Sequence, residues 1–423
     1  LMAATSSPLE LGPTVTLGAA STLNSAHGTS ISASDFKAEV NSVIGLRDCD
    51  VQRLHLTEIS DGQYELTVQI GDQQRRIRYV EHSIRTDSYQ LLSQAPDGTL
   101  VEIPAGPVNT YRGVDASWPG MKSAMSIEDD GFRARFLCDD GEQWWLEPLI
   151  DRVRGADASD YVVYRGEDVI YPAGFCGVTD KHGTAFPASN APAIPGSDRV
   201  VLAAEFVVDT DYEYYQSYGS ESSVENRVNS IVNSFNLQYE SQVEIVNELQ
   251  AVVVRSNSND PYSSNSIETR LEQVGSVWNS TNNPPHDIVQ LFSGVSFSGS
   301  TIGLAWLGAV CSTYEYSVVE SDCCGAFACA TDLSAHELGH NWGAGHCNCP
   351  GNTMNPSITC ANDFASSTIG SITSFRNSIA SCLSDVYGGV CCFQDQCFDS
   401  IAEEGCTNVG GVWNANQNCG QVD

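Results

Sequence analysis

The stretch AHELGHNWGAGHC, residues 335–347, places three of the chain's eight histidines within eleven positions. On a helix, His336 and His340 are four residues apart and therefore lie on one face, about one turn from each other. A catalytic zinc site typically takes three protein ligands. Gly343 can end the helix in a left-handed conformation, which turns the chain and brings His346 back to the same metal. The sequence therefore predicts a zinc site formed by these three histidines.

Glu337 follows the first predicted ligand directly and is predicted to act as the general base. Zinc lowers the pKa of water to about 7. Glu337 would accept the proton of that water as it attacks a peptide carbonyl, and pass it to the leaving amine. A bare HExxH occurs by chance, but five positions here fit the longer pattern HExxHxxGxxH. The alternatives are a structural zinc and a site that binds metal without turnover.

The beginning of this helix is predicted from residues that favour helix starts. Thr331, Asp332 and Ser334 stand just before Ala335, and side chains of these types accept hydrogen bonds from the free N–H groups of a first turn. We expect the helix to begin there.

Composition narrows the class of protein. The chain has 423 residues, 53 acidic and 20 basic, with a formal net charge of −33. Such a polyanion is not expected to bind nucleic acid or an anionic membrane through a general basic surface. Its sixteen cysteines lack zinc-ribbon spacing and favour disulfides in an oxidising compartment. No apolar run approaches the length that spans a bilayer. We expect a soluble, secreted protein.

Sequence patterns divide the chain into four parts. Residues 1–182 alternate strand-like runs with turns and predict a mostly β region. Residues 183–197 are rich in proline and poor in large apolar residues, which predicts an exposed linker that proteases can reach. Residues 198–387 alternate strands and helices, which predicts an α/β domain. Residues 388–423 form a small module that is too short for a core and must depend on disulfides.

Several separated stretches resemble one family of metallopeptidases. The extended histidine motif and Met354 in GNTMNPS, eight residues after His346, are similar to the zinc motif and methionine turn of the metzincins. Within that clan the chain resembles the adamalysin (reprolysin, ADAM-like) branch, through HELGHNWGAGH, HDIVQLFSGVSFSGSTIGLAWLGAVC and FASSTIGSITSFRNSIASCLSD. The resemblance implies a twisted mixed sheet with an active-site helix and a C-terminal helix.

The resemblance also implies a place for the substrate. It puts Gly303, Leu304 and Ala305 on an edge strand that pairs with an extended peptide, so that backbone hydrogen bonds give affinity. The alternative is an ordinary buried strand.

A calcium site away from the zinc is a second implication of the resemblance. Its expected ligands are Glu205, Asp287, the carbonyl of Cys382, and Asp385. Oxygen ligands of this kind suit Ca²⁺. The alternative is a set of solvated carboxylates.

Latency is the third implication. GFCGVTD, residues 174–180, resembles the cysteine switch of the family's propeptides, in which the thiolate of Cys176 would take the fourth zinc position and exclude water. The stretch 111–136 also looks like the family's propeptide. The other two cysteines of this region, Cys49 and Cys138, could pair with each other and leave Cys176 free. The alternative is a disulfide between Cys176 and another cysteine.

One position departs from the family's pattern. The adamalysins usually have aspartate after the third histidine, where this chain has Cys347. A disulfide from Cys347 to Cys349, Cys360 or Cys329 could replace that structural role. No basic convertase site precedes Arg199, so we expect another protease or self-cleavage to remove the pro-region.

Together these features predict a secreted, monomeric zinc endopeptidase made as a latent zymogen. Its substrates would be extracellular proteins or peptides, and its own propeptide would be its inhibitor. The alternative function is an adhesion or ligand-binding protein built on a metalloprotease-like scaffold.

Overall fold

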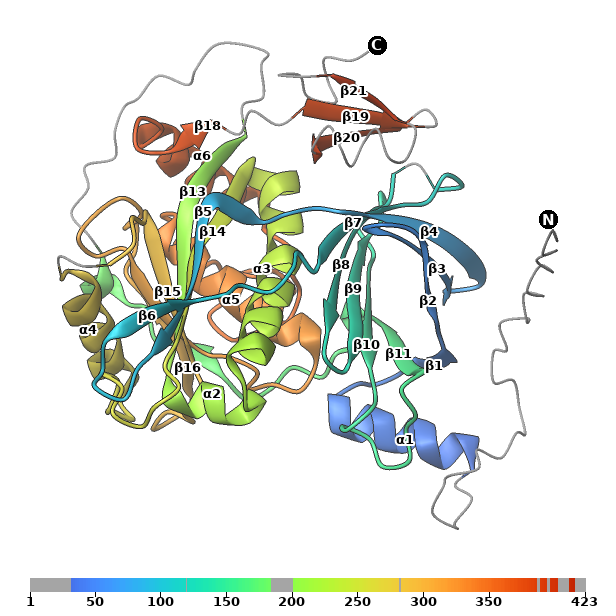
Figure 1. Cartoon of the computed structure of the whole chain (residues 1–423), viewed down its shortest axis with the longest axis horizontal. Coiled ribbons are helices and arrows are strands. Elements are labelled where there is room, and N and C mark those ends of the chain that lie inside the picture. Colours follow the sequence, from blue (N-terminus) through green and yellow to red (C-terminus); the bar gives the residue numbers. More distant parts are fainter. Residues whose placement is uncertain are drawn as a thin grey trace, which may run out of the picture.

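Two large sheets dominate the molecule, and a helix lies between them (Figure 1). The structure is a computed structural model. It describes residues 32–118, 120–183, 201–280, 283–385, 389–393, 396–401 and 411–414. Most of the predicted linker, residues 183–197, lies outside the described residues.

The first sheet is antiparallel and comes entirely from the predicted pro-region. In β3 (Gln63–Ile70) the buried and partly exposed positions largely alternate, as expected for a strand with one face on a core. The helix α1 (Ala33–Ile44), capped by Ser32, buries Phe36, Val40 and Ile44. The strands, in spatial order, are β1 (Asp50–Arg53), β11 (Asp160–Arg165), β10 (Gln143–Pro148), β9 (Gly131–Leu137), β8 (Lys122–Glu128), β7 (Thr110–Val114), β4 (Gln73–Glu81), β3 (Gln63–Ile70) and β2 (Leu56–Ser60).

The second sheet is mixed and joins both halves of the chain. Its four central strands run parallel, and β16 (Thr301–Ala305) runs antiparallel to β17 (Tyr316–Glu320). In spatial order the strands are β12 (Phe175–Cys176), β16 (Thr301–Ala305), β17 (Tyr316–Glu320), β15 (Ile288–Ser293), β13 (Leu202–Thr210), β14 (Ile245–Val254), β5 (Arg85–Gln94) and β6 (Leu100–Ile103); β18 (Ser384–Asp385) pairs with the start of β13.

Helices cover both faces of this sheet. The long helix α3 (Glu221–Val243) lies between the two sheets (Figure 1) and, with α5 (Phe327–Asn341), contributes to the main core. The helix α4 (Ile267–Trp278) packs Leu271, Val274 and Trp278 into a separate core. The remaining helices are α2 (Tyr212–Tyr218), α6 (Ser366–Ser378) and the short 3₁₀ turns η1 (Gly166–Asp168) and η2 (Asp180–His182).

These elements confirm the predicted fold class: an α/β domain with a twisted mixed sheet, an active-site helix and a C-terminal helix, preceded by a mostly β region. A small three-stranded sheet of β19 (Gly389–Phe393), β20 (Gln396–Ile401) and β21 (Val412–Asn414) follows. Within the described residues, no helix has both the length and the apolar character needed to cross a membrane.

The pro-region is not structurally separate from the domain that follows it. Its strand β5 pairs in parallel with β14, and its strand β12 pairs with β16 at the opposite edge of the same sheet. Ion pairs bind it to α3 as well: Arg85 contacts Glu225 at 2.9 Å, and Arg112 contacts Glu240 at 2.6 Å. The sequence did not predict these contacts, because each joins segments more than a hundred residues apart.

Candidate active site

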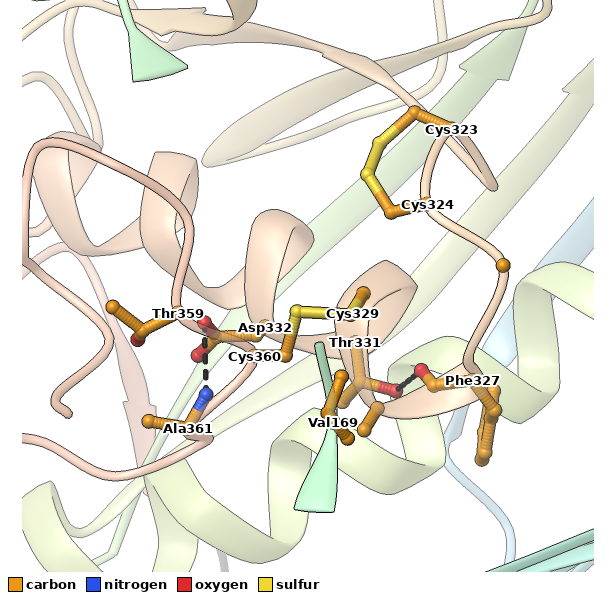
Figure 2. Close-up of a disulfide and its surroundings, with 12 residues drawn as sticks. Val169, Cys323, Cys324, Phe327, Cys329, Thr331, Asp332, Thr359, Cys360 and Ala361 are labelled. Atoms are coloured by element: carbon orange, nitrogen blue, oxygen red, sulfur yellow. Dashed lines mark hydrogen bonds between the residues drawn. A yellow bond between two sulfur atoms is a disulfide. The ribbon is translucent and has the colours of Figure 1, made fainter. Parts of the chain in front are cut away.

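The helix that carries the histidine motif begins earlier than predicted. It starts at Phe327 and is preceded by Ala326, which makes no side-chain cap. Thr331, Asp332 and Ser334 lie inside the helix and are buried, so their prediction as helix starters was wrong. Their polar groups bond elsewhere: the Thr331 hydroxyl donates to the Phe327 carbonyl, and Asp332 accepts from the Ala361 N–H (Figure 2).

The three histidines of the motif meet at one point. The Nε2 atom of His340 lies 3.1 Å from that of His336 and 3.2 Å from that of His346. Nitrogens that share a tetrahedral zinc at about 2.05 Å would be about 3.3 Å apart. The Sγ atom of Cys176 lies 3.4 Å from His340 Nε2, and these four donor atoms all fall within 4.8 Å of one another. This donor set and its spacing fit a zinc ion.

Two of the imidazoles are held in the orientation that a metal needs. The Nδ1 of His336 contacts the carbonyl of Thr353, and the Nδ1 of His340 contacts the carbonyl of Ala344 at 2.7 Å. A carbonyl only accepts, so each Nδ1 carries the proton and each Nε2 keeps its lone pair. Burial lowers the pKa of His336 to about 3 and that of His340 well below its usual range. Both rings are therefore neutral, as metal ligands must be.

Two glycines of the motif allow close packing around the histidines. Gly343 follows the helix at a φ of +86°, the left-handed conformation that turns the chain toward His346. A Cβ at Gly339 would lie 2.6 Å from the sulfur of Met354. Met354 itself is fully buried, so it lies directly against the helix, where the methionine turn is expected.

Glu337 lies between the histidines and the edge of the sheet. A Cβ at Gly303 would stand 2.1 Å from Glu337 Oε1, so only glycine leaves room for the carboxylate at this strand position. This Oε1 is buried and has no hydrogen-bond partner among the described residues. Burial raises the pKa of Glu337 to about 8. A carboxylate with such a pKa can both take and return a proton near neutral pH.

The Cys176 thiol fills the space in front of Glu337. Its Sγ lies 3.5 Å from Glu337 Oε2, to which it donates, and the N–H of Val178 points at the sulfur from 3.4 Å. Burial, with the Glu337 charge as a second cause, raises the pKa of the thiol well above its usual range. A bound zinc would reverse this preference, because a coordinating thiol is deprotonated.

The segment around Cys176 occupies the edge strand predicted to bind substrate. Gly303, Leu304 and Ala305 all lie on β16, whose free edge is covered by β12 running parallel to it. The N–H of Phe175 donates to the Ser300 carbonyl, and that of Gly177 donates to the Gly303 carbonyl at 2.9 Å. Further along, the N–H of Leu307 donates to the His182 carbonyl. The predicted pro-region therefore uses backbone groups along the strand that was predicted to bind an extended peptide.

The residues predicted to bind calcium lie together only in part. The N–H of Glu205 donates to Asp287 Oδ2 at 2.9 Å, and Asp287 Oδ1 lies 3.4 Å from the sulfur of Cys382. Burial, followed by the charges of Glu205 and Glu315, raises the pKa of Asp287 to about 6. Cys382 is in a disulfide with Cys311, so only its carbonyl could be a ligand. The side chain of Asp385 lies outside the described residues.

The disulfides settle several open pairings. Cys347 pairs with Cys349, and Cys329 pairs with Cys360 (Figure 2). Cys323 pairs with its neighbour Cys324. Cys49, Cys138 and Cys176 are free and buried. The predicted pairing of Cys49 with Cys138 was therefore wrong, because each thiol is buried without a second sulfur beside it.

Two residues to which the sequence analysis gave no role in the site, Thr353 and Asp332, organise it. Thr353 orients His336 through its carbonyl, and its hydroxyl donates to Asp332 at 2.8 Å. Asp332 also accepts from the N–H of Asn362, so one buried carboxylate ties the helix to the loop that carries Met354. An aspartate four residues before the first histidine was a usable signal, which the helix-start interpretation obscured.

Comparisons with known proteins agree with this geometry. The reprolysin-type model of metallo-peptidase family M12 matches residues 203–382. The zinc metalloproteinase-disintegrin-like protein atragin of Naja atra is 27% identical over 238 residues, covering 53% of this chain and 38% of that protein. The metalloproteinase-disintegrin-like mocarhagin of Naja mossambica is 26% identical over 275 residues, covering 61% of this chain and 44% of that protein. The chain thus spans less than half of these relatives.

Proposed function

We propose that this protein is a zinc endopeptidase in its latent form, because residues 203–382 match the reprolysin-type model of metallo-peptidase family M12. The observation that carries the proposal is the meeting of three imidazoles, one thiol and the Glu337 carboxylate at one point. The names of the relatives, which describe zinc metalloproteinases, support the same metal and reaction.

His336, His340 and His346 would hold the zinc. When bound, zinc polarises the peptide carbonyl and lowers the pKa of water. Glu337 would take the proton of the attacking water and deliver it to the amine nitrogen as the peptide bond breaks. Its free Oε1, aimed toward Gly303, supports this role.

The edge strand would orient the substrate. Gly303, Leu304 and Ala305 would hold an extended peptide by backbone hydrogen bonds, once β12 has left. Because Phe175 and Gly177 already bond to this edge, substrate and pro-region would exclude each other.

Cys176 would keep the enzyme inactive. Its sulfur takes the space beside Glu337 and His340, where the attacking water would stand. Cleavage within residues 183–197, followed by departure of the pro-region, would open the site. Secretion and action on extracellular proteins belong to the same proposal and are supported by the disulfides and by the snake venom relative. A monomeric state is also part of the proposal.

A calcium ion would stabilise the domain at Glu205, Asp287 and the carbonyl of Cys382, with Asp385 as a further ligand. The pKa of Asp287, raised by burial and then by the neighbouring carboxylates of Glu205 and Glu315, supports this assignment, because the charge of Asp287 is uncompensated. A divalent cation would compensate it.

The test uses the full chain, cut in the linker and loaded with zinc. We expect it to hydrolyse denatured casein and a zinc chelator to stop the reaction. In the uncut chain, Cys176→Ala should raise the basal rate. Hydrolysis that survives both chelation and Glu337→Ala would overturn the proposal, and an uncut Cys176→Ala chain that stays fully latent would overturn the role of Cys176.

A further inference from the structure

The N-terminus of the active-site helix is capped by the pro-region. The N–H of Phe327 donates to Glu147 Oε1 at 3.0 Å, and the N–H of Ala328 donates to the Tyr164 hydroxyl at 3.3 Å. The same hydroxyl donates to Glu147 Oε1 at 2.8 Å. Glu147 lies on β10 and Tyr164 on β11, whereas the helix's own Ala326 offers no side-chain cap.

Arg152 completes this arrangement. Its guanidinium pairs with Glu147 and donates to the carbonyl of Gly325 at 2.6 Å, just before the helix. Glu147 and Tyr164 are each 1% exposed. The indole of Trp145 meets the Phe327 ring edge-on, with centroids 5.6 Å apart. The Glu147 carboxylate is therefore buried at the interface between the pro-region and the following domain, which we call the seam. It has hydrogen-bond or ion-pair partners on both sides of this seam.

The physical basis of this contact is the helix terminus. The first N–H groups of a helix have no partners inside it and carry a partial positive charge, which favours an anion. A carboxylate that accepts from such an N–H makes a charge-assisted bond, stronger than a neutral one. Glu147 supplies that anion to the helix that bears His336, Glu337 and His340.

We propose that the N-terminus of α5 is a docking site for the Glu147 carboxylate and acts as a second latch, independent of Cys176, that keeps the severed pro-region bound after the linker is cut. This inference rests on the proposed function, in which residues 1–182 are a pro-region. The two contacts lie toward opposite ends of α5. Cys176 contacts Glu337 and His340, and Glu147 contacts Phe327.

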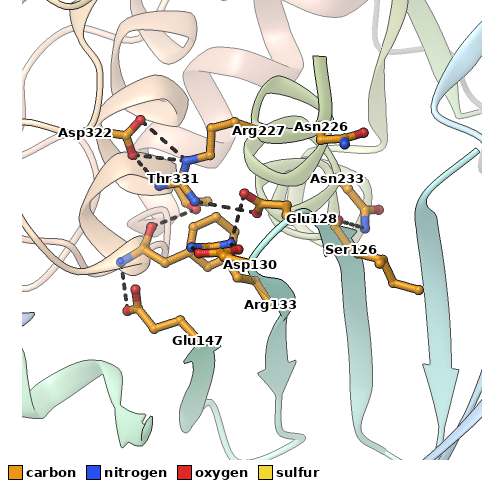
Figure 3. A network of polar contacts seen from close by, with 12 residues as sticks. Ser126, Glu128, Asp130, Arg133, Glu147, Asn226, Arg227, Asn233, Asp322 and Thr331 are labelled. Atoms are coloured by element: carbon orange, nitrogen blue, oxygen red, sulfur yellow. Dashed lines mark hydrogen bonds and ion pairs between the residues drawn. The ribbon is translucent and has the colours of Figure 1, made fainter. Parts of the chain in front are cut away.

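The surroundings of the latch make it sensitive to salt. A cavity of about 500 Å³ lies at this seam, and Glu128, Arg133, Arg152, Arg227, Asp322 and Gly325 contribute to its lining. Figure 3 shows Arg227 paired with Asp322 within the domain, and Arg133 paired with Glu128 and Asp130 within the pro-region. One pair crosses between the two parts, because Arg227 Nη1 lies 3.7 Å from Glu128 Oε1. Ions that enter the cavity would screen this pair. The charged pairs at this interface, with those that join Arg85 and Arg112 to α3, therefore make its strength depend on salt, while apolar contacts such as Trp145 with Phe327 also cross it.

The experiment measures retention of the pro-region rather than activity. A recognition sequence for a specific protease replaces part of residues 184–197 in the full chain, in a Glu337→Gln background that prevents self-cleavage. After cutting and zinc loading, the fragments are separated by size-exclusion chromatography over a range of NaCl concentrations. We expect co-elution at 0.15 M salt and dissociation as salt rises. Separate elution at 0.15 M salt would overturn the latch.

Variants assign the effect to the capping site. Glu147→Gln should release the pro-region about tenfold faster, because a neutral amide replaces the anion at the helix terminus. Tyr164→Phe keeps the ring but removes the hydroxyl, so the pro-region should dissociate faster than in wild type but less so than with Glu147→Gln. This variant replaces Glu147→Gln in the test if that protein folds poorly. The control is Glu167→Gln, whose side chain is 68% exposed and pairs only with Arg165 of the pro-region. Equal release rates for all three would contradict the proposal.

Independence is tested by repeating Glu147→Gln with Cys176→Ala. The same factor should appear, since contacts at separate sites add in free energy. If Glu147→Gln no longer changed the release rate in the Cys176→Ala background, the two contacts would form one latch, and the claim of independence would be wrong. If the cut protein with intact Glu337 never hydrolyses peptides, the proposed function fails while the retention result still stands.

Discussion

The two predicted metal sites of this molecule differ in how far the protein has prepared them. At the histidine cluster, two imidazoles are neutral and fixed by the carbonyls of Thr353 and Ala344. At Asp287, a carboxylate lies near other negative groups and its pKa is raised to about 6. The imidazoles of the first cluster are already held in place, so a bound metal would add little to the order of their side chains. At the second site, a bound cation would compensate the negative charge of Asp287 and its neighbours. Metal at the first should therefore govern rate, and metal at the second should govern stability.

The largest expected effect is at Glu337. Replacing it with Gln keeps the shape of the side chain but removes the base, so the rate on a peptide substrate should fall by about 10³-fold or more. Zinc content, measured by mass spectrometry, should stay at the wild-type level. The matched control is Glu272→Gln, on the exposed face of α4. A zinc-free variant would mean that Glu337 serves the metal rather than the reaction.

A smaller effect on rate is expected from Gly303→Ala. The new methyl group would reach 2.1 Å from Glu337 Oε1, so the carboxylate must move. A misplacement of about 1 Å costs roughly 10²-fold in rate. Kinetics of the activated enzyme would measure this loss, and the melting temperature should change little. Gly370→Ala is the control, because its Cβ meets nothing within 4 Å. An unchanged rate would show that the carboxylate position near Gly303 does not matter.

Removal of calcium should act on stability alone. Chelation of Ca²⁺ with EGTA should lower the melting temperature of the zinc-loaded protein by about 5 to 10 °C. The reason is that an ion that binds only the folded state stabilises that state, and this stabilisation is lost when the ion is removed. Initial hydrolysis rates at 25 °C should remain. Differential scanning calorimetry with added Ca²⁺ or Mg²⁺ measures the first effect. A calcium-free protein that melts at the same temperature would remove the difference between the two sites.

The smallest effect is expected from Asp287→Asn. With Ca²⁺ present the variant should melt about 2 to 4 °C below the wild type, because one charged ligand is lost. Without Ca²⁺ the difference should vanish or reverse, since the substitution also relieves repulsion from Glu205 and Glu315. The exposed Asp61→Asn is the control. A variant that melts lower by the same amount with and without Ca²⁺ would indicate lost packing instead.

The sequence predicted the local geometry of the candidate site, in which the three histidines lie together. A spacing of four residues on a helix decides that His336 and His340 share a face, and Gly343 decides the turn to His346. The resemblance to a known family added Cys176, Met354 and the edge strand. Their roles remain predictions, although the structure brings these groups together.

The contacts across the seam could not be predicted. Glu147 meets Phe327 across 180 positions, and strand β5 meets β14 across more than 150. No periodicity or spacing in one sequence encodes such pairs, because they depend on how two sheets pack around α3. The start of α5 was misplaced for the same reason. Its true cap comes from another part of the chain, so the polar residues nearer the motif gave a misleading signal.

The pairing of β5 with β14 would have a consequence if the pro-region leaves as proposed. β14 is ten residues long, almost entirely buried, and bordered by β13 on one side and β5 on the other. Loss of the pro-region would leave a long apolar strand with an unsatisfied row of N–H and C=O groups, which is a template for self-association. The residues from Asp198 onward carry 26 acidic and five basic side chains. Repulsion between such polyanions would keep mature molecules apart, so colloidal stability should depend on ionic strength far more once the pro-region has left.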